Sequence, residues 1–224
     1  MTLRAPPICS CIAAPALSAA PSHTLSCQHL RDNGIEQFLT ERHDYVKEHL
    51  VNLLREAGHH VTAEPSGLDP HSRQRPDIAV TDMRGRYFLL DVTVVNPTAD
   101  SRSANMNETE NDAVLQKNRK YALLAQQERA QLIPLVFNAY GHWHQLVTDL
   151  LAFTDDSPTP AFRAISQNTQ LHPQQWRNHA ATTLACALQH GNALIIIHAA
   201  QSLRALVSAR ARALASAARQ PLAG

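Results

Sequence analysis

Hydrophobic residues recur at helical spacing in the first part of the chain that has a regular pattern. They begin after Glu36, and polar or charged residues occupy most of the positions between them. The apolar positions are Phe38, Leu39, Val46, Leu50, Leu53 and Leu54. This period predicts an amphipathic helix, and Gly58 is typical of the residue that follows the end of one.

Two strand patterns follow the helix and are the strongest in the chain. They cover residues 77–81 and 87–95, and the connection between them contains Gly85. A short connection with a glycine predicts a β-hairpin. The second segment is apolar on both faces except at Asp91, which is typical of a central strand. A shorter strand is predicted over residues 60–63.

The second half of the chain combines further helices with one strand. The predicted elements are a helix over 112–127, a strand over 132–137, a helix over 142–153 and two helices between 173 and 218. Pro134 indicates that the strand lies near a sheet edge, because proline cannot donate a backbone hydrogen bond. Gly191 and Asn192 mark the break between the last two helices. The polar stretch 98–111 lacks core-forming residues and predicts a loop.

This order of elements predicts an α/β fold with a helical C-terminal extension. We divide the chain into a leader over residues 1–34, a core over 35–153 and the extension over 154–224. No run of 18 apolar residues exists, so a membrane span is not predicted. The apolar stretch 8–20 is interrupted by Pro15 and has a single basic residue before it, which does not indicate a secretory signal.

Composition adds little to this picture. The 224 residues carry a formal net charge of +1, with 17% charged and 44% hydrophobic residues. These are the proportions of an ordinary globular protein. Because the charge of the whole chain gives no argument for nucleic acid, such an argument depends on local groups of residues.

Asp77 and Asp91 are the candidate metal ligands. A hairpin places their strands side by side, so both carboxylates can reach one ion. Mg²⁺ prefers oxygen ligands, and when bound it polarises a phosphate and lowers the pKa of an attacking water. Asp77 alone has a simpler explanation, since aspartate commonly caps turns. Asp91 within an apolar strand needs a metal, a lysine or a hydrogen-bond donor, because a buried unpaired carboxylate is costly.

Several short motifs surround these two acids in a characteristic order. They are Arg42-His43-Asp44, Arg75-Pro76-Asp77, Asp91-Val92-Thr93, Lys117 and Lys120-Tyr121. In this order they resemble the PD-(D/E)xK nuclease superfamily, and more narrowly the restriction-like endonuclease domain of site-specific non-LTR retrotransposons. Residues 134–137, Gly141 and 187–193 are similar to the surrounding pattern of that family. The resemblance extends from about residue 9 to residue 200.

The resemblance implies a restriction-endonuclease-like sheet flanked by helices that binds one or two divalent ions, Mg²⁺ or Mn²⁺, and hydrolyses DNA. It implies that Asp77 and Asp91 are metal ligands and that a lysine orients or activates the nucleophile. Thr93 stands where the superfamily usually has this lysine, so Lys117 or Lys120 from the following helix would supply it. For the product of a eukaryotic retroelement, the resemblance also implies a nuclear location.

The choice between the two lysines stays open. Lys117 and Lys120 lie three residues apart on one helical face, so either can point at the site. We favour Lys120 because it adjoins Tyr121, a candidate accessory residue that the apolar pattern turns inward. The alternative for both lysines is a solvated helix surface. Glu48 on the first helix is a candidate accessory acid, and its alternative is an ordinary exposed glutamate.

The leader contains four candidate zinc ligands. Cys9, Cys11, His23 and Cys27 supply the sulfur and nitrogen atoms that structural Zn²⁺ prefers. The resembling retrotransposon proteins have a Cys-Cys-His-Cys zinc knuckle just upstream of the nuclease domain, which agrees with this position. The spacing from Cys9 to Cys11 is shorter than usual, and His29 can replace His23. Three reduced cysteines without a metal are the alternative.

The C-terminal segment has a local excess of positive charge. Arg204, Arg210 and Arg212 occur with no acidic residue between Gln201 and the end of the sequence. Together with Arg75 they are candidate DNA phosphate contacts, and the alternative is an arginine-rich solvated face. Upstream of them, Trp176 is predicted to be buried and Cys186 to pack within a helix.

Three functions are open on the sequence alone. The first is a Mg²⁺-dependent endonuclease that nicks DNA. The second is a catalytically inactive, nucleic-acid-binding remnant of a mobile element, which Thr93 in the lysine position favours. The third is an interaction or scaffold domain that keeps only the fold.

Overall fold

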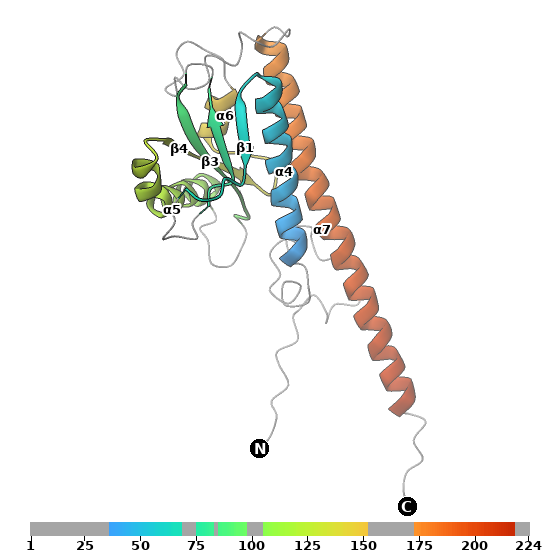
Figure 1. Cartoon of the computed structure of the whole chain (residues 1–224). Helices are drawn as coiled ribbons and strands as arrows, with labels where there is room; N and C mark the ends of the chain where they lie inside the picture. The colour runs from blue at the N-terminus through green and yellow to red at the C-terminus, as the bar shows by residue number, and fades with distance from the viewer. Residues whose placement is uncertain (1–35, 69–74, 83–84, 98–104, 152–172, 218–224) are drawn as a thin grey trace, which may run out of the picture.

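The structure, a computed structural model, describes residues 36–68, 75–82, 85–97, 105–151 and 173–217 (Figure 1). Its centre is a four-stranded mixed sheet with helices on both faces. The sheet order follows the sequence: β1 (His60–Ala63), β2 (Ile78–Thr81), β3 (Tyr87–Val95) and β4 (Gln131–Asn138). The α/β class expected from the sequence is therefore confirmed.

β3 has a neighbour on each side in this sheet. It pairs antiparallel with β2 and parallel with β4, and β2 pairs antiparallel with β1. The predicted hairpin and the central position of residues 87–95 are confirmed. β4 is an edge strand, as Pro134 indicates, because an edge tolerates a residue without a backbone N–H.

α4 (Glu36–Glu56) packs on one face of the sheet. Val46, Leu50, Leu53 and Leu54 of its apolar pattern are buried in one cluster with the β3 side chains on that face, Phe88, Leu90 and Val92, whereas Phe38 and Leu39 are half-buried. The helix ends at Gly58, as predicted. This glycine has a φ of 84° and donates a hydrogen bond to the carbonyl of Arg55 at 2.9 Å, a common way to end a helix.

α5 (Met106–Gln127) covers the opposite face of the sheet. Tyr121 and Leu124 of this helix form a small core cluster with Ala79 and Leu89. Since alternate residues of a strand point to opposite faces, Asp91 points to the same side as Leu89. The acid in the middle of β3 therefore faces α5.

α5 begins earlier than predicted, so the expected loop is wrong over residues 106–111. Asn105 caps the helix, and its side-chain oxygen accepts a backbone hydrogen bond from the first turn at 3.1 Å. Glu110 in the next turn is buried and pairs with Nδ1 of His142 at 2.8 Å. Buried polar pairs of this kind leave no hydrophobic pattern in the sequence. Residues 98–104 of the expected loop lie outside the described residues.

α7 (Pro173–Ala217) is one continuous helix of 45 residues, so the predicted break is wrong. Gly191 is a packing residue, because a Cβ added there would lie 2.6 Å from Cγ of Arg42 on α4. Asn192 accepts a hydrogen bond from Nη1 of Arg42 at 2.9 Å and donates one to the carbonyl of Ala139 at 2.6 Å. These two residues bring α4 and α7 close together instead of ending a helix.

The first half of α7 belongs to the main core. Trp176, Ala180, Leu184 and Leu188 lie in the same buried cluster as α4 and the sheet, which confirms the burial of Trp176. The short helix α6 (Gln145–Leu151) also adds apolar side chains to this cluster. Cys186 is exposed, so its predicted packing is wrong. The division between core and extension stays a prediction.

α7 is the one helix within the described ranges that is long and apolar enough to cross a membrane. One face of its first half is buried in the core, and core helices of globular proteins often have the same composition. The expected absence of a membrane partner therefore stays a prediction.

We predict that Gly191→Ala destabilises the protein by roughly 1–2 kcal/mol in urea unfolding. Alanine normally favours a helix over glycine by about 1 kcal/mol, but the new Cβ would meet Cβ, Cγ and the backbone Cα of Arg42 within 2.8 Å. Ala193→Gly at an exposed position of the same helix measures the propensity term alone. A stabilising Gly191→Ala would contradict the close packing of α4 against α7.

Candidate functional site

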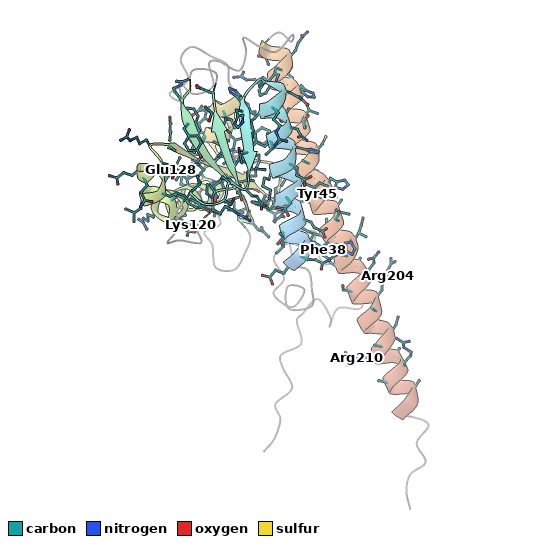
Figure 2. The ribbon with its side chains drawn as sticks, viewed as in Figure 1. Phe38, Tyr45, Lys120, Glu128, Arg204 and Arg210 are labelled. Atoms are coloured by element: carbon teal, nitrogen blue, oxygen red, sulfur yellow. The ribbon has the colours of Figure 1, made fainter. Side chains whose placement is uncertain are left out.

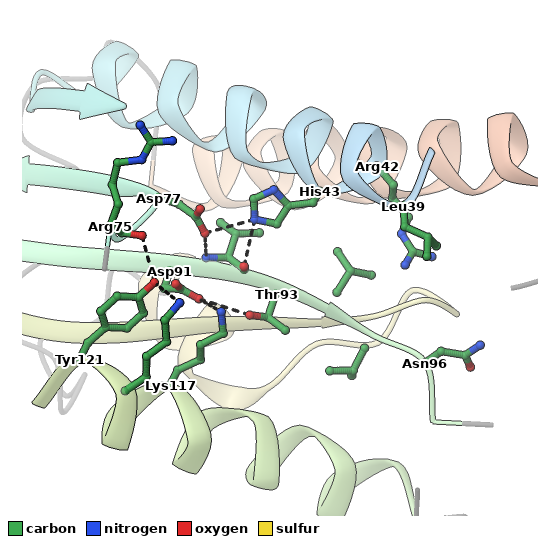
Figure 3. Close-up of a pocket in the computed structure, with 14 residues that line it drawn as sticks. Leu39, Arg42, His43, Arg75, Asp77, Asp91, Thr93, Asn96, Lys117 and Tyr121 are labelled. Atoms are coloured by element: carbon green, nitrogen blue, oxygen red, sulfur yellow. Dashed lines mark hydrogen bonds and ion pairs between the residues drawn. The ribbon is translucent and has the colours of Figure 1, made fainter. Parts of the chain in front are cut away.

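A cavity of about 400 Å³ lies where α4, the β2–β3 pair and α5 meet (Figure 3). Its wall combines two carboxylates with several cationic side chains and one tyrosine. The polar side chains that line it are Arg42, His43, Arg75, Asp77, Asp91, Thr93, Asn96, Lys117, Lys120 and Tyr121. Most residues that the sequence nominates as a catalytic site are thus brought to one place.

Asp91 is the buried acid of this cavity, with only 2% of its surface exposed. Its Oδ2 forms an ion pair with Nζ of Lys117 at 2.7 Å. The hydroxyl of Thr93 donates a longer hydrogen bond to the same oxygen at 3.3 Å. The expectation that Asp91 needs a metal, a lysine or a donor is met by the lysine and the hydroxyl.

Asp77 lies opposite Asp91, just before β2 begins. Ile78 pairs with Leu90 in the β2–β3 ladder, so the residue before Ile78 faces Asp91 across the two strands. Oδ2 of Asp77 accepts a hydrogen bond from the Val92 N–H at 2.7 Å. The carboxylate therefore fixes the start of β2 to β3, which agrees with the structural alternative that the sequence left open for it.

His43 also binds Asp77, from the side of α4 (Figure 3). Its Nε2 lies 3.2 Å from Oδ2 of Asp77 and 3.1 Å from the carbonyl oxygen of Val92, and its Nδ1 lies 3.2 Å from Oδ1 of Asp44. Each ring nitrogen thus faces an acceptor, an arrangement that favours the doubly protonated form of the ring. Burial alone would lower the pKa of His43, but the hydrogen bonds and charge of Asp77 and the hydrogen bond to Asp44 raise it above its ordinary value.

The role of His43 is one that sequence reasoning missed. The run Arg42-His43-Asp44 belongs to the motifs that carry the family resemblance, but the resemblance implies no function for these three residues. Both His43 and Arg42 line the cavity from the first turns of α4. The helical period placed this helix correctly, but it carried no information about which turn approaches the two acids.

Tyr121 connects Lys120 on α5 with the backbone at Arg75, just before Asp77. Its hydroxyl donates to the carbonyl of Arg75 at 3.0 Å and accepts from Nζ of Lys120 at 2.7 Å. Burial raises the pKa of the Tyr121 hydroxyl well above its ordinary range, and the carboxylates of Asp91 and Asp77 raise it further. Both acids therefore lie near the same hydroxyl, which is protonated at all ordinary pH values.

The two candidate lysines have different places in this arrangement. Lys117 contacts Asp91 directly. Lys120 contacts Tyr121, and its ammonium also lies 4.5 Å from the centre of that ring. Both lysines line the cavity, so either remains available for chemistry, but Lys117 is the one in contact with an acid.

A chain of ion pairs begins at Arg75, which lines the cavity, and ends on α4. Nη2 of Arg75 binds Glu64 at 2.8 Å, and Nζ of Lys47 binds Glu64 at 2.6 Å and Asp44 at 2.8 Å. The hydrogen bond from Lys47 holds the pKa of Glu64 below its ordinary value. Since Asp44 also binds His43, the chain ties Arg75 on one side of the cavity to α4 on the other.

The remaining candidate residues lie elsewhere. Glu48 is exposed on α4 and does not line the cavity. Arg204, Arg210 and Arg212 are exposed near the C-terminal end of α7. The four candidate zinc ligands, Cys9, Cys11, His23 and Cys27, lie outside the described residues.

No protein-family model matches this sequence, and no curated protein matches it.

Two features of the site bear on the kind of ligand that it can bind. Among the described residues, no group of three or more His, Cys, Asp and Glu side chains is arranged to hold a metal ion. Two carboxylates with water as the remaining ligand are nevertheless a common set for Mg²⁺, which keeps several waters when bound. In addition, the cationic side chains around the cavity outnumber the two acids. This excess favours an anionic ligand.

We predict that Lys117→Met lowers the free energy of unfolding by about 3 kcal/mol in metal-free buffer. Removing one partner of a buried ion pair leaves the other charge without compensation, and the Asp91 side chain is 2% exposed. Lys120→Met is the matched control, and we expect a cost below about 1 kcal/mol because an exposed lysine contributes little. Equal costs for the two variants in urea unfolding would contradict the pairing of Lys117 with Asp91.

We predict that the stability advantage of the native protein over His43→Gln decreases as the pH rises. A histidine whose folded pKa is raised contributes stability that is fully present below its unfolded pKa, near 6.5. That contribution is lost as the pH rises through the folded pKa. Urea unfolding of both proteins between about pH 6 and pH 9, with a chelator present, measures it. A difference that does not change with pH would contradict a raised pKa of His43 in the folded protein.

Proposed function

We propose that this chain is a divalent-metal-dependent endonuclease that nicks DNA. The observation that carries the proposal is the convergence of Asp77, Asp91 and Lys117 in one cavity with an excess of cations around it. Two acids that can hold a divalent ion, with a lysine that can stabilise phosphate charge, suit metal-assisted phosphodiester hydrolysis. The order of elements is a helix (α4), a hairpin (β2–β3), a second helix (α5) and a parallel strand (β4). This order supports a restriction-endonuclease-like core.

In this proposal the carboxylates of Asp77 and Asp91 share one Mg²⁺ or Mn²⁺ ion. His43 and the Val92 N–H both bind Oδ2 of Asp77. Within the described part of the chain, Oδ1 of the same carboxylate accepts no hydrogen bond. The chain thus fixes one oxygen of this carboxylate and leaves the other for a ligand. Asp77 and Asp91 would hold the ion, which would supply charge stabilisation for the phosphate and a more acidic water.

Lys117 would have two roles in this reaction. Without a metal, it neutralises the buried carboxylate of Asp91. With a phosphodiester bound, its ammonium would stabilise the negative charge that develops on the phosphate. Thr93, two residues after Asp91 on the same face of β3, contacts the same carboxylate oxygen as Lys117. In this proposal Lys117 from α5 takes the role beside Asp91 that the resemblance gives to a lysine at the position of Thr93.

Other side chains would bind and orient the phosphate. Arg42 and Lys120 line the cavity and carry positive charge. His43 is a positioning residue in this scheme, since its protonated ring holds Oδ2 of Asp77 and keeps the carboxylate in one orientation. Tyr121 stays protonated and supports the backbone at Arg75, so it acts through position and not as a base.

A second function is a binding domain without catalysis. The ion pair between Lys117 and Asp91 at 2.7 Å favours it, because the lysine occupies an oxygen that a metal would need. In that case the cavity would still bind a phosphate through its cations. Structural zinc in the leader is a separate proposal, and metal analysis of the full chain tests it.

We predict that the purified protein nicks supercoiled plasmid DNA in Mg²⁺ or Mn²⁺ and that Asp77→Asn and Asp91→Asn reduce the rate at least about 100-fold. Lys117→Met is expected to cause a loss of similar size, and Lys120→Met a smaller one. Asp149→Asn removes a carboxylate from α6, outside the cavity, and is the matched control.

The outcomes separate the two functions. Nicking that survives Asp91→Asn rejects the endonuclease proposal. DNA binding that persists without nicking in any divalent metal supports the binding domain.

A further inference from the structure

α7 continues past the beginning of α4. Near that point the ring of Phe38 on α4 stacks on His198 of α7, with centroids 3.8 Å apart. Ala199 is still buried, but beyond it the described side chains of residues 201–217 are exposed, apart from a half-buried Ser202. Figure 1 shows this part of α7 extending beyond α4 and the sheet. We call residues 201–217 the α7 arm.

The arm begins close to the cavity. Leu39, Arg42 and His43 in the first turns of α4 line the cavity, and Phe38, which stacks on α7, is the residue before them. Figure 2 shows Arg204 and Arg210 on α7 beyond the level of Phe38. The direction of the arm is fixed at Gly191 and Asn192, where α7 lies against Arg42.

Every charged residue of the arm is positive. Arg204, Arg210 and Arg212 are exposed, and the arm contains no aspartate or glutamate. Residues two apart on a helix differ by about 200° around its axis, so Arg210 and Arg212 project to nearly opposite sides. A helix with cations on opposite sides suits a groove that has negative charge along both walls. The major groove of a nucleic-acid duplex admits an α-helix and has a phosphate strand on each side.

We propose that the α7 arm binds the phosphates of a DNA duplex that extends away from the cavity. The arm is about 26 Å long at 1.5 Å per residue, which corresponds to about 8 base pairs. Its partner is a polyanion and not a second copy of this chain, because two such arms would place like charges side by side. The position of the duplex relative to the cavity rests on the proposed function, but the phosphate contacts of the arm do not.

The test is a salt titration of binding to a 30-base-pair duplex by fluorescence anisotropy, with a chelator present. The triple variant Arg204→Gln, Arg210→Gln, Arg212→Gln should weaken binding about 10-fold or more and reduce the salt slope by about 2–3, since each phosphate contact contributes about one. A triple arginine-to-lysine variant at the same positions should keep the slope, because it keeps the charge.

The matched control removes three arginines outside the arm. Arg55→Gln, Arg129→Gln and Arg177→Gln give the same change in net charge at other sites. If this control weakens binding as much as the arm variant does, the proposal is wrong. It is also wrong if the arm variant binds the duplex normally but loses binding to anionic lipid vesicles or loses self-association in sedimentation.

Two further measurements separate this proposal from the endonuclease. Asp91→Asn should abolish nicking and leave the salt slope unchanged, so a protein that binds through the arm but never nicks refutes only the catalytic proposal. If the protein nicks normally and its duplex binding does not respond to the arm substitutions, only the proposal for the arm is wrong.

Discussion

The structure depends on how a carboxylate is accommodated in the middle of its central strand. Asp91 is 2% exposed within β3, and no apolar packing can compensate a buried charge. Lys117 compensates it from α5, and α5 has to lie close to the sheet to do so. Tyr121 and Leu124 pack this helix against Ala79 and Leu89 and keep the lysine in reach. A pair of this kind contributes little net stability compared with apolar side chains of the same size, so its presence points to function.

The opposite face of the sheet supplies the second half of the site. α4 is fixed against the sheet by its buried leucines and against α7 by the close approach at Gly191. That packing places His43 within hydrogen-bond distance of Asp77. The two acids are thus oriented by different helices, Asp91 by α5 and Asp77 by α4. A change in the packing of either helix alters the distance or orientation of one acid relative to the other.

Much of this arrangement could be predicted from the sequence, and the exceptions have physical causes. The hairpin and the central strand follow from apolar runs around Gly85, and the pairing of Asp91 follows from the cost of burying it alone. The start of α5 could not be predicted, because Glu110 is buried with a polar partner and gives no apolar signal. Gly191 and Asn192 have the composition of a helix end but serve helix packing. The contact of His43 with Asp77 depends on how α4 lies on the sheet, which no local pattern encodes.

A crystal structure with Mn²⁺ and anomalous diffraction data tests directly whether Asp77 and Asp91 share a metal ion. We expect an anomalous peak within about 2.5 Å of a carboxylate oxygen of both Asp77 and Asp91, with oxygen ligands only. We also expect Nζ of Lys117 to lie farther from Oδ2 of Asp91 than the present 2.7 Å. An empty site at high Mn²⁺ concentration, with the ion pair between Lys117 and Asp91 unchanged, would contradict a shared metal ion.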